Sequence, residues 1–564
     1  MKLLVLFALF ISIQTISSQS SCSNLNNSTL ILETTYGKIR GKCENYPIYY
    51  ESKPYQETNP ILSWLSVPYA KSPLKDLRFK DPESPEKWTN IRDGTKKSPK
   101  CYQRSYSSGD TSNYSEDCLY LNIYTTLDSY NNTVVHGSRQ LKPIMVWIHG
   151  GSLIAGSSNG YDGGILAGIS DIIVITINYR LGAFGWLYIQ GTDAKGYQGF
   201  KDQTMALKWI RENAIRFGGD PDKVTISGNS AGSWSVGYHL ISKQSKGLFS
   251  GAILQSGIVF RIYLQSSLRS PEQATSMTRY LAENIGLNFT SNLNMLEFLQ
   301  KSDAQTLAKK GIELLDIPVF PRDPDYFDKE PLEYMKSGDF NKVPVMAGFN
   351  NLESFGLTYE ENLKDDIQAL MAGNKDRLKP ILVNRLWLSQ NNSKIDELIN
   401  TYIQESNNNG TVDYFRYLLD ILSDFYFPCP HYLFNELVGK YNGGKMFAYE
   451  FAQRPKYWDG YWVNYDGANH EDEIGYMFGS ALRYKSYNDY SSEDKLLSEK
   501  MVRYWSDFIK YKIPAFDWKP HGLTQSSNSV NFYYIKYGQT KTEPRLKYSL
   551  NRKCQLWDEI ALNP

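Results

Sequence analysis

The sequence has almost no excess of one charge, and after its first residues it contains no long apolar run. Its 564 residues carry 61 Lys and Arg against 60 Asp and Glu, a formal net charge of +1. A near-neutral chain without a basic block lacks the electrostatic footprint of nucleic-acid binding, so we expect no nucleic-acid partner. The N-terminal apolar run is about a dozen residues long, whereas a membrane-spanning helix needs about 20. We therefore expect no stable membrane span.

The N-terminus has the layout of a secretory signal peptide. Met1-Lys2 precede the apolar run LLVLFALFISI, and the small polar residues TISSQSS follow it. A charged start, a short apolar run and a small-residue exit are typical of such peptides. We predict a signal peptide over 1–20, a mature chain over 21–564, and a secreted or vesicular location. An N-terminal anchor is the alternative.

Cysteine is scarce but even in number. In an oxidising compartment six cysteines predict three disulfides, and fifteen pairings are open. The cysteines are Cys22, Cys43, Cys101, Cys118, Cys429 and Cys554. Sequons predict glycosylation on surface loops. They begin at Asn26, Asn27, Asn113, Asn131, Asn288, Asn391 and Asn409.

Short apolar runs alternate with helical patterns along the chain. The runs that predict buried strands are 143–148, 171–179, 223–227, 251–256, 343–349 and 445–451. Between them, the stretch 201–217 carries an apolar helical face of Ala206, Trp209, Ile210, Ala214 and Phe217. This alternation predicts an α/β fold with a large, mostly parallel sheet covered by helices on both faces. The stretches 260–340 and 355–440 are expected as helical insertions, and no Pro-, Gly- or Ser-rich linker divides the chain.

One predicted strand ends in a turn of small residues that contains a serine. The turn is Gly228-Asn229-Ser230-Ala231-Gly232, and a helical pattern follows it. Gly-x-Ser-x-Gly between a strand and a helix is the nucleophile-elbow pattern, in which the tight turn excludes bulky neighbours and holds the hydroxyl clear of the backbone. The Ala231 N–H then lies at a helix start, where it can face developing negative charge.

A serine nucleophile needs a base and an oxyanion site. Consecutive N–H groups in the Gly-rich loop His149-Gly150-Gly151-Ser152, directly after an apolar strand, can form an anion-binding concavity. The order serine, acid, histidine leaves three of the six histidines as the base, and elimination does not choose among them. They are His431, His470 and His521. No zinc-type histidine pair is present, so we expect neither a metal nor another cofactor.

Three blocks of sequence resemble the type-B carboxylesterases, the cholinesterase-like branch of the α/β-hydrolases. The blocks are FGGDPDKVTISGNSAG (217–232), EDCLYLN (116–122) and SVPYAKSPLKDLRFKDP (66–82). The resemblance covers essentially the whole mature chain and implies an α/β-hydrolase fold, a single large domain and a secreted serine esterase acting on small ester substrates. The Asn- and Tyr-rich composition also resembles the esterase-like secretory proteins of social amoebae.

The resemblance also implies roles for particular residues. The blocks GFNNLESF (348–355) and GANHEDEIGYMFG (467–479) make Glu353 the acid and His470 the base for Ser230. The oxyanion hole would use the N–H groups of Gly151, Ser152 and Ala231. Cys101 would pair with Cys118 and Cys429 with Cys554, which leaves Cys22 for Cys43. Arg78 and Glu116 match a salt bridge of the family.

The sequence departs from the family pattern near the expected site. Ser152 replaces a third glycine, Leu153 an aromatic residue, and Asn229 an acid, while the loop 101–118 contains no tryptophan. Without that acid and an indole face for a quaternary ammonium, we expect a preference for uncharged esters. Ser152 has less backbone freedom than glycine, which predicts a somewhat misshaped oxyanion hole and a modest rate. An imidazole pKa near 6.5 predicts that activity falls below about pH 6.

Two other functions share the sequence features. One is a non-catalytic adhesion or storage protein of the cholinesterase type. The other is a lipase that works at oil surfaces with the same triad. The presence of Ser230, Glu353 and His470 favours an enzyme.

Overall fold

The computed structural model describes most of the chain. The described residues are 22–24, 30–53, 56–103, 113–260, 268–315, 320–323, 326–354, 363–386, 388–389, 391–404, 412–457, 465–483, 488–522 and 528–562. The predicted signal peptide and the sequons at Asn26, Asn27 and Asn409 lie outside them.

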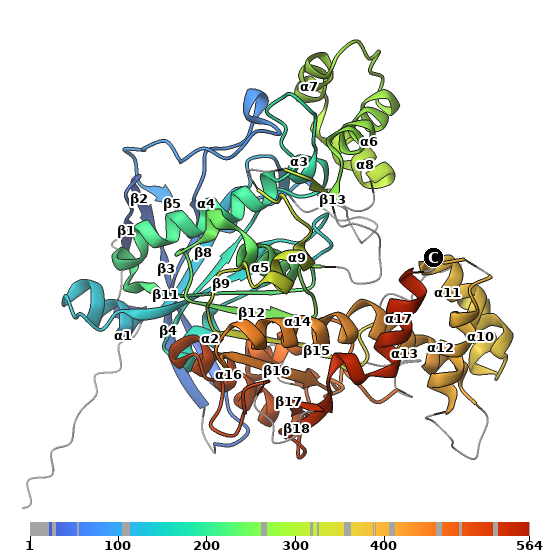
Figure 1. Ribbon diagram of the computed structural model, residues 1–564. Helices are drawn as coiled ribbons and strands as arrows, with labels where there is room; N and C mark the ends of the chain where they lie inside the picture. Colours follow the sequence, from blue (N-terminus) through green and yellow to red (C-terminus); the bar gives the residue numbers. More distant parts are fainter. Residues whose placement is uncertain are drawn as a thin grey trace, which may run out of the picture.

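One large sheet forms the centre of the described chain (Figure 1). In spatial order its eleven described strands are β18 (Lys541–Leu546), β17 (Ser529–Ile535), β16 (Met446–Phe451), β15 (Val345–Asn350), β12 (Gly251–Gln255), β11 (Gly219–Asn229), β9 (Lys142–Ile148), β10 (Ile173–Ile177), β8 (Tyr120–Thr126), β4 (Gln56–Pro68) and β3 (Lys42–Tyr49). The strands from β17 to β10 pair in parallel, and the pairs at the two margins are antiparallel. The predicted mostly parallel sheet is confirmed.

The central strands were predictable because helices cover both of their faces. Every residue of β10, β12 and β15 is buried, so these strands are continuous apolar runs. The margin strands β3, β4, β8, β17 and β18 were not predicted, because polar residues interrupt or replace an apolar run in each of them. The edge strand β18 carries Lys541, Pro544 and Arg545, residues that discourage further strand pairing.

Helices form a layer on each face of the sheet. On one face α4 (Gln198–Asn213), α5 (Ala231–Ile241) and α14 (Pro428–Tyr441) contact the central strands, and on the other α2 (Gly164–Ser170) and α16 (Ser492–Tyr511) do so. Helix α4 begins three residues before the predicted stretch and gives way to a 3-10 turn at Ala214–Phe217, and its predicted apolar face is buried. Figure 1 shows the two layers above and below the sheet.

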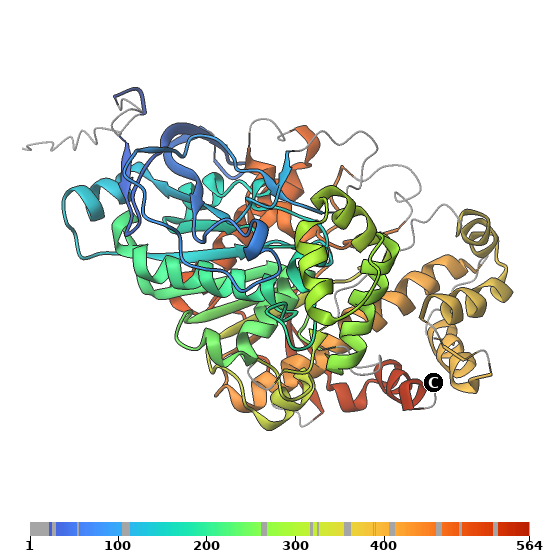
Figure 2. The ribbon, with the colours of Figure 1, turned by 90° about the horizontal axis from the view of Figure 1, so that it is seen from above.

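The predicted insertions are helical and make two groups outside these layers (Figure 2). The first contains α6 (Pro271–Asn284), α7 (Asn292–Lys301) and α8 (Ala304–Leu315), which share a core with α3 (Gly182–Trp186). The second contains α10 (Lys364–Met371), α11 (Leu378–Leu386), α12 (Ser393–Gln404) and α13 (Tyr414–Tyr426), which pack with α17 (Arg552–Leu562). The remaining helices are α1 (Leu127–Tyr130), α9 (Pro331–Ser337) and α15 (Asp472–Met477).

Three disulfides join the pairs that were expected. Cys101 bonds to Cys118, Cys429 to Cys554, and Cys22 to Cys43, with Cα–Cα distances of 5.0, 5.3 and 5.4 Å. The second of these ties the C-terminal helix α17 to the start of α14. In the chain-entropy account, closing a loop of this length contributes about 4 to 5 kcal/mol.

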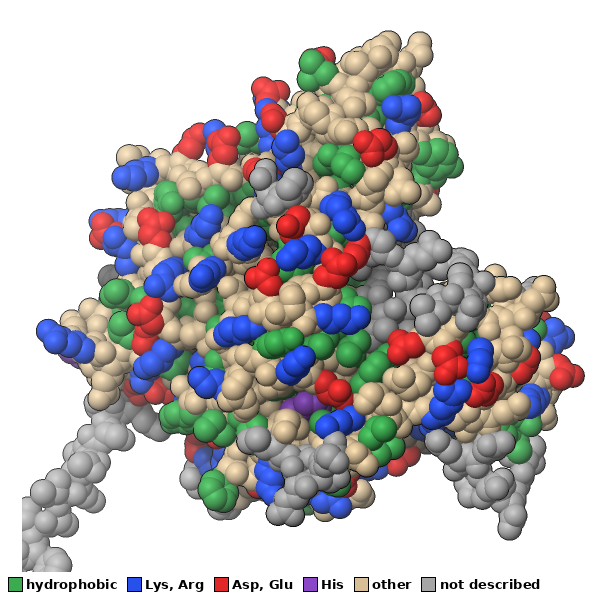
Figure 3. All heavy atoms as spheres, viewed as in Figure 1, with side chains coloured by type: hydrophobic (Ala, Val, Ile, Leu, Met, Phe, Trp, Pro, Cys, Tyr) green, Lys and Arg blue, Asp and Glu red, His purple; other side chains and the backbone are tan. Residues whose placement is uncertain are grey.

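The surface carries both signs of charge. Figure 3 shows Lys and Arg side chains interspersed with Asp and Glu over the face formed by α4, α5 and α14. No helix in the described part of the chain combines the length and apolar composition that a bilayer crossing requires.

Candidate functional site

Ser230 occupies a strained turn between β11 and α5. Its backbone angles are φ 56° and ψ −124°, a conformation that costs a non-glycine residue of order 1–3 kcal/mol. The turn is held by strand β12 and by helix α5, because the Ser230 N–H donates to the Gln255 carbonyl at 2.9 Å and the Trp234 N–H donates to the Ser230 carbonyl at 3.0 Å. Ser230 is half-buried at the carboxyl end of the sheet.

The two glycines of the turn are required by close backbone contacts. A Cβ on Gly232 would lie 2.0 Å from the Ile148 carbonyl oxygen, and one on Gly228 would lie 2.5 Å from the Gly232 carbonyl carbon. Both distances are below any contact that a real Cβ makes. The sequence predicted crowding within the turn, and the structure adds that much of it comes from the end of the adjacent strand β9.

The Gly-rich loop after β9 lies against this turn. A Cβ on Gly150 would be 3.1 Å from the Cβ of Ser230. The loop turns through left-handed angles at Gly151, Ser152 and Leu153, with φ of 106°, 54° and 62°. Among the residues that the structure describes, no acceptor contacts the N–H of Gly151, Ser152 or Ala231. Three unpaired donors beside a serine are what an oxyanion requires.

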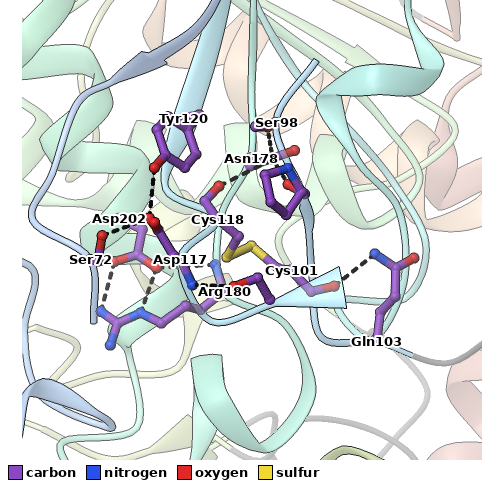
Figure 4. Close-up of a disulfide and its surroundings, with 12 residues drawn as sticks. Ser72, Ser98, Cys101, Gln103, Asp117, Cys118, Tyr120, Asn178, Arg180 and Asp202 are labelled. Carbon is purple, nitrogen blue, oxygen red and sulfur yellow. Dashed lines mark hydrogen bonds and ion pairs between the residues drawn. A yellow bond between two sulfur atoms is a disulfide. The ribbon is translucent and has the colours of Figure 1, made fainter. Parts of the chain in front are cut away.

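The disulfide Cys101–Cys118 helps to fix that loop (Figure 4). The Gln103 side chain donates to the Cys101 carbonyl at 3.0 Å and to the Gly156 carbonyl at 2.8 Å, and it accepts from the Gly156 N–H at 2.9 Å. On the other side, the Asn178 side chain donates to the Cys118 carbonyl at 3.1 Å. The loop's far end is therefore anchored to a covalently closed segment.

Arg78 and Glu116 form the expected salt bridge beside this disulfide. Two parallel bonds of 2.6 Å join the guanidinium to the carboxylate, and both side chains are almost fully buried. Arg78 also donates to the carbonyls of Leu299 and Ser302, which fastens α7 to the segment. A bidentate pair with these additional bonds fixes geometry as well as adding energy.

Glu353 and His470 are in direct contact, although 117 residues separate them. Nδ1 of His470 lies 2.6 Å from Oε2 of Glu353, which follows β15 and is fully buried. The other oxygen, Oε1, accepts the Asn350 N–H at 2.7 Å. The Phe427 ring packs on the imidazole with a centroid distance of 4.8 Å. The arrangement fixes the ring and its tautomer in the manner of a catalytic base.

The other two candidate histidines have no carboxylate partner among the described residues. Nε2 of His431 accepts the Gly257 N–H at 3.0 Å, and Nδ1 of His521 lies 3.0 Å from the Asn531 carbonyl. Burial lowers the pKa of His431 to about 3 and that of His521 to about 4, so both are neutral at pH 7.

The pKa of His470 is raised, whereas those of His431 and His521 are lowered. Burial alone would lower this pKa, but the hydrogen bond and the charge of Glu353, with the charges of Glu471 and Glu473, outweigh it and raise the pKa above its ordinary value. The expectation of an unperturbed imidazole is therefore wrong, because the sequence could not show how many carboxylates surround the ring.

Glu473 is a site residue that the sequence reasoning missed. It is fully buried in α15, and its carboxylate accepts the Asn229 side chain at 2.8 Å, the Gln255 side chain at 2.9 Å and the Asn350 side chain at 2.7 Å. These donors come from the carboxyl ends of β11, β12 and β15. The signal available was an acid three residues after His470 in the same block of sequence.

The Glu473 network joins the two halves of the site. Asn229 precedes Ser230, while Asn350 donates its backbone N–H to Glu353 and its side chain to the Asn469 carbonyl at 2.6 Å. The turn of Ser230 and the loop of His470 are thus fastened to one carboxylate. Asn229 supplies one of the donors that satisfy Glu473.

The sequons that fall on described residues are accessible to different degrees. Asn113, Asn288 and Asn391 are exposed, and Asn131 is half-buried. Glycosylation at all of these positions stays a prediction.

A serine in a strained strand-to-helix turn, on a mainly parallel sheet with helices on both faces, defines the α/β-hydrolase class. Comparison with known proteins agrees. A model of the Carboxylesterase family matches residues 28–557. The acylcarnitine hydrolase of Mus musculus is 32% identical over 477 residues, which cover 82% of this chain and 81% of that protein.

Two further relatives cover more of the chain. The medium-chain fatty acyl-CoA hydrolase precursor of Anas platyrhynchos is 32% identical over 553 residues, 94% of this chain and 92% of its own length. Acetylcholinesterase 4 of Caenorhabditis briggsae is 31% identical over 581 residues, 94% of this chain and 90% of its own. The chain belongs to the Carboxylesterase family, and it is a carboxylic ester hydrolase of the serine esterase type.

Proposed function

We propose that the protein hydrolyses uncharged carboxylic esters through Ser230, His470 and Glu353. The observation that carries the proposal is the 2.6 Å contact between the His470 imidazole and the fully buried Glu353 carboxylate. The left-handed turn at Ser230, tied to the same buried network, supports it.

The reaction proceeds through an acyl-enzyme. His470 removes the proton from the Ser230 hydroxyl, while Glu353 orients the ring and stabilises its charged form. The serine oxygen attacks the ester carbonyl to give a tetrahedral oxyanion. His470 then passes the proton to the departing alcohol. A water molecule, activated by the same imidazole, releases the acid and restores Ser230.

The oxyanion is held by backbone donors. The N–H groups of Gly151, Ser152 and Ala231 have no acceptor within the described residues, which leaves them available to a ligand. Each such donor is worth roughly 3 kcal/mol in the transition state.

The proposed preference for uncharged esters rests on two features of the chain. The loop between Cys101 and Cys118 has no tryptophan, and Asn229 gives its side-chain amide to Glu473. The loop therefore offers no indole face, and position 229 no carboxylate, to a quaternary ammonium. We expect faster turnover of 4-nitrophenyl acetate than of acetylthiocholine, and the reverse ranking would contradict this preference.

The nucleophile is tested by labelling with a fluorophosphonate probe. We expect one adduct on the peptide that carries Ser230, and no adduct in Ser230→Ala. Ser250→Ala is the matched control, because Ser250 is a half-buried serine at the opposite end of the neighbouring strand β12. If the folded wild-type protein is not labelled, the non-catalytic adhesion or storage function replaces the enzymatic one. A lipase would label equally but would accelerate sharply on emulsified substrate.

We also propose export as one domain over 21–564 after removal of residues 1–20. The three disulfides favour an oxidising compartment. Mass spectrometry of the mature N-terminus and of glycopeptides tests this, and an intact Met1 in the purified native protein would contradict it.

A further inference from the structure

Ser152 carries a hydroxyl in the loop after β9, the loop that lies against the Ser230 turn at Gly150. It is exposed, although it belongs to a loop whose neighbouring residues Leu153, Ile154 and Ala155 are buried. No acceptor or donor among the described residues contacts its side chain. A glycine would supply the same backbone N–H without the penalty of a left-handed angle. What serine adds at this position is therefore a Cβ and a free O–H.

Hydrogen bonds to the carbonyl groups of the two residues that flank Ser152 fix the backbone of the loop. The Leu153 carbonyl accepts the Gly182 N–H at 2.9 Å and the Trp186 indole N–H at 3.0 Å. The Gly151 carbonyl accepts two N–H groups within the loop, at 3.0 and 2.9 Å. The carbonyls that flank Ser152 are thus engaged, while the N–H groups of Gly151 and Ser152 have no acceptor among the described residues. The donors are organised before a ligand arrives.

We propose that the Ser152 hydroxyl is an additional donor to the oxyanion, beside the N–H of the same residue. A serine hydroxyl rotates freely about its C–O bond, and in a gauche rotamer it lies close enough to its own N–H for both to reach one acceptor. The side chain then offsets part of the cost of the left-handed backbone with charge stabilisation in the transition state. The inference rests on the proposed function, because it requires an oxyanion on the Ser230 side of the loop.

The test compares Ser152→Ala with Ser152→Gly. Ser152→Ala keeps the Cβ and the backbone preference and removes only the hydroxyl, whereas Ser152→Gly removes the hydroxyl and the steric penalty together. We expect kcat for 4-nitrophenyl acetate to fall roughly 10- to 100-fold in both variants, with little change in KM. We expect the inhibition constant of a trifluoromethyl ketone, which forms an oxyanion on Ser230, to rise by a similar factor.

Fluorophosphonate labelling separates the outcomes. A labelled wild-type protein together with Ser152→Ala at wild-type kcat would overturn this inference and leave the proposed function intact. A slow Ser152→Ala beside a Ser152→Gly that is as fast as wild type would also overturn it, since backbone fit rather than the hydroxyl would then set the rate. An unlabelled wild-type protein would overturn the proposed function and the inference with it.

Discussion

Replacing the buried Glu473 by glutamine tests how the two halves of the site are held together. The carboxylate accepts three side-chain amides, two on Oε1 and one on Oε2. Glutamine retains one oxygen and presents an NH₂ group in place of the other. In the more favourable of the two orientations of the glutamine amide, its oxygen still accepts hydrogen bonds from Asn229 and Gln255. Its NH₂ group then faces the side-chain NH₂ of Asn350, so two donors meet and no hydrogen bond forms there.

The magnitude follows from that orphaned donor. A buried donor without a partner costs about 1–3 kcal/mol, and the two remaining bonds weaken because their acceptor is no longer charged. Loss of the costly buried charge offsets part of this. We expect Glu473→Gln to lose about 1–3 kcal/mol of unfolding free energy, measured by urea denaturation. With the Ser230 turn less fixed, kcat/KM on the pH plateau, where His470 is neutral in both proteins, falls about tenfold, the equivalent of 1.4 kcal/mol.

The same substitution changes the pH dependence. The negative charge of Glu473 raises the pKa of His470, so its removal lowers that pKa. Since the neutral imidazole is the active base, the rising limb of kcat/KM against pH moves to lower pH. Glu471→Gln is the matched control: Glu471 is exposed and also raises the His470 pKa, so that limb should move while the unfolding free energy, measured at a pH above the His470 pKa, stays unchanged. Equal stability of the two variants would refute the proposed role of the network.

Three further outcomes are expected. In the wild-type enzyme the rising limb of the pH–rate profile should have its midpoint above pH 6.5, because the raised pKa of His470 keeps the ring protonated to higher pH; a midpoint below 6 would contradict this. Gly232→Ala places a Cβ 2.0 Å from the Ile148 carbonyl, so soluble expression or fluorophosphonate labelling should be lost, and normal labelling would count against the described turn. Asp202→Asn leaves the buried Arg180 guanidinium without its charge partner at 2.7 Å, and we expect a loss of about 3–5 kcal/mol in unfolding free energy; a change under 1 kcal/mol would argue that the pair is not isolated from solvent.

The central sheet could be predicted because its strands are buried on both faces. Such strands are short apolar runs, as in β10 and β12, and they stand out in the sequence. The margin strands could not be found in the same way. β18 is almost entirely polar and β3 mixes polar with apolar residues, so neither forms an apolar run, although each pairs with the strand next to it in the sequence.

Part of the site was likewise readable from the sequence. Gly228 and Gly232 could be identified from the sequence alone. Only glycine fits at these positions, because a Cβ there would collide with the backbone at the end of β9. Glu353 and His470 came from resemblance to a family, since nothing in their local sequence distinguishes a catalytic carboxylate from a surface acid.

The sequence by itself determined the class of fold, the strand-to-helix turn with its serine, and the pool of three histidines, because these depend on local pattern and on the backbone freedom of glycine. Only the tertiary structure decided which histidine meets a carboxylate, which direction its pKa moves, and that Glu473 joins the ends of three strands. These properties arise from burial and from distances between residues far apart in the chain. Desolvation and Coulomb interactions depend on that three-dimensional arrangement, which no local pattern records.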